Sequence, residues 1–176
     1  MSQGQLVIHA ATMTVGTREV GRNGGKTVQQ WQDEAATELH AGYGTYHHEP
    51  WCGMSVMHWY RVAGVSHDGI AHPAVSEICR VGEQRKARWT PDQGPIPVGS
   101  IYVLQCGVHT GVVLHHGRGD RWITTIEGNT SDMVAVRHQA LTNVPGHLRR
   151  KRPGIEVYGG FDGGHSALQP GHGDPR

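Results

Sequence analysis

The sequence contains no long hydrophobic run and almost no excess of charge of either sign. None of its 176 residues belongs to a stretch approaching the ~20 apolar residues of a membrane span. The first residues, MSQGQLVIHAATMTV, lack the basic and apolar segments of a signal peptide. The formal net charge is +1, too small for a broad attraction to nucleic acid. We therefore expect a monomer that is made in the cytoplasm, does not insert into membranes and does not bind nucleic acid.

Cysteine is scarce, and the count is odd. The chain has Cys52, Cys79 and Cys106, with no CxxC pair among them. We therefore expect neither a disulfide framework nor a structural zinc knuckle. The 14 histidines lack the fixed ligand spacing of a zinc site, so no metal ion or other cofactor is expected. A single thiol with a special role remains possible.

The length suits one domain with one sizeable core. We expect a single folded domain over residues 1–158. The segment 159–176 is rich in Gly, His and Pro and nearly free of apolar residues, which predicts a flexible tail. The basic run at 149–152 is interpreted as a solvated surface loop.

Apolar residues at helical spacing predict a helix from Lys26 to about His40. A second helix is predicted to begin at Pro50, because proline is tolerated in the first turn, and to end at Gly64. A shorter helix is expected over residues 73–81. The residues before Lys26 are interpreted as an apolar opening followed by a glycine-rich turn.

After Trp89 the helical spacing of apolar residues gives way to a β-type pattern. Short β-type runs are separated by Gly, Asp and Asn at hairpin distances. They predict strands over 100–105, 109–115, 122–127, 133–137 and 155–158. Helices followed by antiparallel strands predict an α+β fold, with N-terminal helices packed on the sheet.

Cys52 falls in the first turn of the second predicted helix. The free N–H groups and the positive end of the helix dipole at that position favour an anion, so a reactive thiolate is plausible there. The alternative is a buried structural cysteine, and position alone does not choose between them. Cys79 and Cys106 lack this placement and are interpreted as structural.

Polar residues on two predicted strands offer partners for such a thiol. His109 begins an apolar strand and can face a helix terminus, although an ordinary strand-edge histidine is the simpler interpretation. Glu127 and Asn129 close the next strand and share a face, because side chains alternate along a strand. Either can orient an imidazole, the third role of a catalytic triad, although Gly-Asn is also common in turns.

Three motifs in this order resemble the CHAP family, the cysteine- and histidine-dependent amidohydrolases/peptidases of the NlpC/P60 group. They are Glu-Pro-Trp-Cys-Gly-Met at 49–54, Val-His-Thr-Gly-Val-Val at 108–113 and Ile-Glu-Gly-Asn-Thr at 126–130. The resemblance covers roughly residues 10–140. The acidic calcium loop of some phage members is absent, so calcium is not expected.

The resemblance implies a papain-like NlpC/P60 fold. It implies Cys52 as nucleophile, His109 as general base, and Glu127 and Asn129 as the residues that orient the imidazole. The Cys52 backbone N–H would contribute to the oxyanion hole. The substrate would be bacterial peptidoglycan, cut at a stem-peptide or cross-bridge bond or at the amide that joins sugar to peptide.

Several roles remain open at this point. A phage-type lysin, released to the wall by a holin, is the preferred interpretation. An injected antibacterial toxin, with an immunity protein as partner, would use the same chemistry. A non-catalytic wall-binding or assembly module is the competing class. A zinc hydrolase that uses Cys52 and several histidines is a further alternative.

Overall fold

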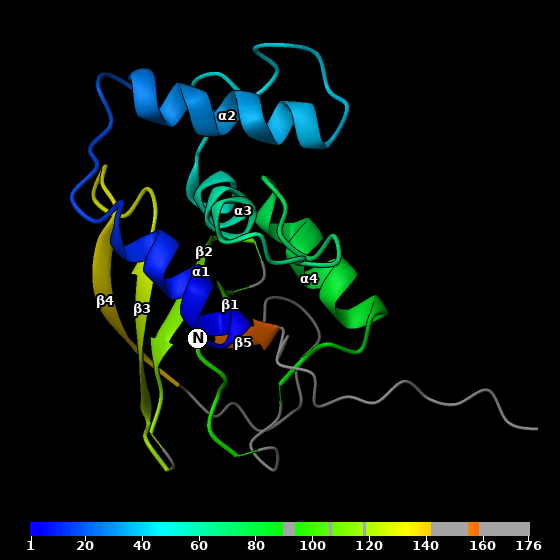
Figure 1. Cartoon of the computed structure of the whole chain (residues 1–176), viewed down its shortest axis with the longest axis vertical. Coiled ribbons are helices and arrows are strands. Elements are labelled where there is room, and N and C mark those ends of the chain that lie inside the picture. The colour runs from blue at the N-terminus through cyan, green and yellow to red at the C-terminus, as the bar shows by residue number, and fades with distance from the viewer. Residues whose placement is uncertain (90–93, 106, 118, 142–154, 159–176) are drawn as a thin grey trace, which may run out of the picture.

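A computed structural model describes residues 1–89, 94–105, 107–117, 119–141 and 155–158. This part of the chain forms four helices followed by a five-stranded antiparallel sheet of order β4-β3-β2-β1-β5 (Figure 1). The α+β class expected from the sequence is therefore confirmed. The helices are α1 (Gln3–Thr12), α2 (Lys26–Glu38), α3 (Cys52–Ala63) and α4 (Val75–Gln84), and the strands are β1 (Ile101–Leu104), β2 (His109–His115), β3 (Trp122–Glu127), β4 (Ala135–Ala140) and β5 (Ile155–Tyr158).

The main core lies between the helices and one face of the sheet. Helix α3 packs against β2, and α1 packs against both α3 and the sheet, while α2 covers α3 from outside (Figure 1). The first turns of the buried α3 carry apolar side chains on nearly all sides, as expected for a central helix. Trp31 of α2 is 2% exposed, so it is a core residue as its helical spacing predicts. A smaller cluster covers the opposite face of the sheet and comprises Ile96, Tyr102, Val113, Ile123 and Val157.

Helix α1 was not expected from the sequence. Ser2 caps it, because its hydroxyl accepts from the Gln5 backbone N–H while the Gln5 side chain accepts from the Ser2 N–H. Gly4 lies so close to the Val98 carbonyl that a Cβ would clash with it. The apolar opening of the chain is therefore a helix docked by a close backbone approach, not a plain lead-in to the glycine-rich turn.

Two predicted boundaries are wrong in ways that affect the site. Helix α3 begins at Cys52, not at Pro50, because Trp51 is the N-cap with a non-helical backbone (φ −106°, ψ 13°). Strand β4 begins at Ala135, not at Met133. A turn with positive φ at Asn129, Ser131 and Asp132 occupies the preceding residues. Helix α4 is also displaced from the predicted range 73–81 and ends at Gln84.

No disulfide framework was expected from the sequence, but the structure adds a single bridge. Cys79 is disulfide-bonded, and its partner lies outside the described residues. An odd cysteine count excludes a fully paired framework, but it permits one bridge beside one free thiol. That free thiol is Cys52.

Three sequence interpretations fall outside the described residues: the tail 159–176, the basic run 149–152 and the role of Cys106. No helix in the described part of the chain is both long and apolar enough to cross a bilayer.

Candidate active site

Cys52 is the first residue of α3, at the helix end that faces the sheet. Its N–H belongs to the first turn, where backbone donors have no partner within the helix. The Ser55 hydroxyl donates to the Cys52 carbonyl at 2.7 Å, and the indole N–H of the adjacent Trp51 donates to Glu19 at 3.0 Å. These contacts hold the turn that presents the thiol. Cys52 is 4% exposed, so the sulfur lies in a sheltered position.

A close approach of β3 to α3 brings the thiol to the sheet. Gly128 directly follows β3, and a Cβ at this position would clash with the Ser55 side chain and lie 2.9 Å from the Trp51 ring. Only glycine lets the strand end this near to the first turn of α3. The residue before it, Glu127, is thereby positioned beside the nucleophile's helix.

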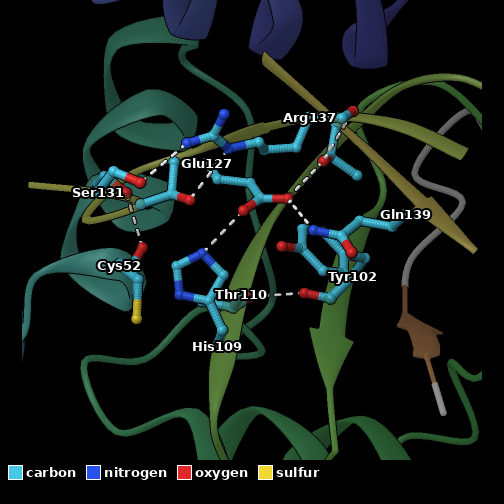
Figure 2. A network of polar contacts seen from close by, with 11 residues as sticks. Cys52, Tyr102, His109, Thr110, Glu127, Ser131, Arg137 and Gln139 are labelled. Atoms are coloured by element: carbon cyan, nitrogen blue, oxygen red, sulfur yellow. Dashed lines mark hydrogen bonds and ion pairs between the residues drawn. The ribbon is translucent and has the colours of Figure 1, made fainter. Parts of the chain in front are cut away.

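His109 connects the thiol with Glu127. Its Nε2 lies 3.0 Å from Oε2 of Glu127, across the β2–β3 pair. The other ring nitrogen, Nδ1, points toward the side of the ring on which Cys52 lies (Figure 2), close enough for the thiol to affect the electrostatics of the imidazole. Figure 2 shows the Cys52 sulfur and the Glu127 carboxylate on opposite sides of the His109 ring. The three side chains therefore form a continuous chain of contacts from sulfur to carboxylate.

The Glu127 carboxylate is 1% exposed and well supplied with donors. Its Oε1 accepts from the Thr125 hydroxyl at 2.6 Å and from the Gln139 amide at 2.8 Å, while Oε2 contacts His109 (Figure 2). The buried Tyr102 hydroxyl lies near enough to affect the carboxylate but outside regular hydrogen-bond geometry. A buried carboxylate with this many donors is fixed as an anion.

The electrostatics support an ion pair between the His109 imidazole and the Glu127 carboxylate. Burial alone would lower the pKa of His109, but its contacts with Cys52 and then with Glu127 raise it from 6.5 to about 9. Burial would raise the pKa of Glu127, but hydrogen bonds from His109, Thr125 and Gln139, together with the nearby Tyr102 hydroxyl, lower it from 4.5 to about 2. His109 is therefore protonated and Glu127 ionised at neutral pH.

Of the two residues that the sequence offered as orienters, Glu127 makes the contact with His109. Asn129 instead adopts a positive φ of 56° in the turn after β3, and its amide donates to the Asn23 side chain at 3.3 Å. Asn23 in turn donates to the His48 carbonyl at 3.1 Å. Asn129 thus joins the β3–β4 turn to the glycine-rich loop before α2.

Sequence reasoning missed Thr125 and Gln139, which support the carboxylate. Thr125 had a usable signal, because it is two residues from Glu127 and so shares its face. Gln139 had none, since the predicted β4 stopped at Arg137 and the register between β3 and β4 was unknown.

Several histidines have structural partners away from this site. His47, His58 and His67 lie within 2.8 Å of the carboxylates of Asp33, Glu34 and Glu38, all on α2, which accounts for part of the histidine excess. Among the described residues, no group of three or more His, Cys, Asp and Glu side chains is arranged to hold a metal ion.

Comparison of the chain with models of protein families, with curated proteins and with solved structures finds no match.

Proposed function

We propose that the protein is a cysteine-dependent amide hydrolase of bacterial peptidoglycan. The observation that supports this most is the contact chain Cys52–His109–Glu127, in which the only free thiol of the described residues meets a protonated imidazole held by a buried carboxylate. This is the arrangement that nucleophilic catalysis requires: a nucleophile, a base and a group that orients the base.

In the proposed mechanism, the Cys52 thiolate attacks the carbonyl carbon of the substrate amide. The Cys52 backbone N–H donates to the developing oxyanion, a type of contact worth about 3 kcal/mol in the transition state. The His109 imidazolium then gives its proton to the departing amine as the C–N bond breaks, which leaves a thioester on Cys52. Neutral His109 takes a proton from water, the resulting hydroxide attacks the thioester, and the acid product leaves as the thiolate reforms.

Peptidoglycan is the proposed substrate because the motifs around the three residues resemble the CHAP family and the wider NlpC/P60 group. The bond cut would be in the stem peptide or cross-bridge, or between sugar and peptide. The disulfide at Cys79 supports action outside the cytoplasm, because such bridges persist mainly in oxidising compartments. A released lysin is the preferred role, and an injected antibacterial toxin would use the same chemistry.

The test is clearing of purified cell walls, measured as loss of turbidity. Cys52→Ala and His109→Ala should each abolish clearing to a similar extent, because residues that act as a unit lose function together. His115→Ala is the matched control, since this histidine lies exposed at the far end of the same strand. Clearing by Cys52→Ala at the parent rate would overturn the assignment of the nucleophile.

A thiol probe separates the enzyme from a wall-binding module with no activity. Iodoacetamide should alkylate Cys52 in the folded protein near neutral pH. The loss of clearing activity should be proportional to the fraction of Cys52 that is alkylated. Cys79 should react only after reduction, because it is in a disulfide. Wall binding with no turnover by the unmodified protein would favour the binding module.

A further inference from the structure

A half-buried arginine lies on the same face of the sheet as the catalytic carboxylate. Arg137 of β4 pairs directly with Thr125 of β3, and directly paired residues share a face. Gln139, two residues further along β4, donates to Glu127 from that same face. The Arg137 side chain therefore belongs to the surface that carries the proposed active site.

The guanidinium is directed toward the end of β3 at which Glu127 stands. Its Nε donates to the Thr130 hydroxyl at 3.3 Å and its Nη2 to the Ser131 hydroxyl at 3.1 Å (Figure 2). Both hydroxyls belong to the turn that begins just after Glu127-Gly128. Two neutral acceptors thus fix the direction of the side chain and leave the other guanidinium donors for a further acceptor.

No carboxylate of the described residues pairs with this cation. Of the arginines described, only Arg88 and Arg137 are neither exposed nor fully buried, and Arg88 pairs with Glu83 at 3.4 Å. The nearby Glu127 is already committed, because its two oxygens receive Thr125, Gln139 and His109. Partial burial of a charge with only neutral partners is unfavourable on its own, which points to an anionic ligand.

We propose that Arg137 binds a free carboxylate of the substrate, next to the bond that Cys52 attacks, and so selects stem peptides in which that carboxylate is not amidated. This inference rests on the proposed function and adds the feature by which the site chooses among peptides. The planar guanidinium matches a carboxylate with two parallel hydrogen bonds, which lysine cannot reproduce. Peptidoglycan stems supply such groups on side chains and at chain ends.

The experiment uses purified muropeptides in which each free carboxylate is converted in turn to the primary amide. For the parent protein, one of these amides should lower kcat/KM by about 10- to 100-fold, mainly through KM, as expected for loss of a charged hydrogen-bonded pair. Arg137→Gln should lose the same factor on the free acid and show no preference between acid and amide. Arg137→Lys should recover part of the preference.

Two controls keep the outcome interpretable. Arg121→Gln alters an exposed arginine at the opposite end of β3 and should keep the parent's preference. Binding of the acid and amide forms to Cys52→Ala, measured by calorimetry, reports carboxylate capture without turnover. If the acid form binds more tightly than the amide form but the parent protein cleaves neither, the proposed function is wrong and the inference about Arg137 stands.

Three results of the muropeptide assay would overturn the inference. They are a parent that cleaves acid and amide forms equally, an Arg137→Gln protein that retains the parent's preference, or one whose activity falls equally on all substrates. Should Arg137→Gln fail to fold, judged by thermal unfolding, the parent and Cys52→Ala measurements still decide. A wall polymer that bears phosphate groups could also occupy the site. If it inhibits cleavage more strongly than the free-acid muropeptide does, Arg137 binds phosphate, and the proposal that it binds a substrate carboxylate is wrong.

Discussion

The Nε2 atom of His109 lies 3.0 Å from a carboxylate oxygen of Glu127 that is almost completely shielded from solvent. The pairing spans β2 and β3, so the sheet itself sets the distance. Because the carboxylate also accepts from Thr125 and Gln139, its orientation does not depend on the imidazole alone. The ring is thus held with its other nitrogen toward Cys52 before any substrate arrives.

The first prediction concerns the alkaline limit of activity. His109 must be protonated to release the amine, and its pKa is raised to about 9, so kcat/KM should fall above about pH 9. Glu127→Gln removes one of the charges that raise this pKa and should move the decline toward pH 6.5, the ordinary histidine value. The measurement is kcat/KM between pH 5 and 10.5. Glu77→Gln, on the exposed surface of α4, should leave the profile in place.

The same pair predicts how stability depends on pH. The pKa of His109 is higher in the folded state, so its contribution is complete below pH 6.5 and is lost as the pH rises through about 9. The pKa of Glu127 is lower in the folded state, so its contribution is complete above pH 4.5 and is lost as the pH falls toward about 2. Urea unfolding should therefore show the largest difference between parent and His109→Gln at pH 4.5–6.5. An equal difference at pH 10 would contradict this account.

Gly128→Ala should damage both the fold and the site. The added methyl group would meet Ser55 and Trp51, and overpacking of this kind costs about 1–3 kcal/mol of unfolding free energy. The displacement would also move Glu127 relative to α3, so wall clearing should fall by more than the stability loss explains. Gly42→Ala is the control, because its Cβ would meet only the Thr45 hydroxyl, at 3.6 Å. Normal clearing by a folded Gly128→Ala protein would show that the close approach is not needed.

Gln139 is predicted to act as a positioning residue through Glu127. Gln139→Ala removes a donor to a buried carboxylate and should lower kcat/KM by about 10-fold, with KM nearly unchanged. It should also raise the pKa of Glu127, which a nuclear magnetic resonance titration of the carboxylate can follow. His138→Ala changes the adjacent, exposed residue of β4 and should have little effect on either quantity. An unchanged carboxylate titration in Gln139→Ala would exclude the positioning role.

The sequence predicted the strands that carry the site better than the contacts that complete it. Strands β2 and β3 have the predicted bounds, because short runs of β-type residues with turn residues on both sides mark them clearly. Helix α1 escaped because its packing depends on Gly4 meeting a turn that lies more than 90 residues away in the chain. The choice between Glu127 and Asn129 also needed the structure, since a positive φ at Asn129 turns its side chain toward Asn23. Local patterns do not reveal such long-range contacts.

The disulfide at Cys79 makes the order of folding and oxidation matter. Three cysteines allow three single bridges, and two of these consume Cys52. A chain oxidised while still unfolded is therefore at risk of losing its nucleophile to a mispaired bridge that no later folding step removes without thiol exchange. Burial of Cys52 in the first turn of α3 protects it once the helices have packed. Preparations refolded under reducing conditions and oxidised afterwards should consequently contain a larger active fraction than those oxidised first.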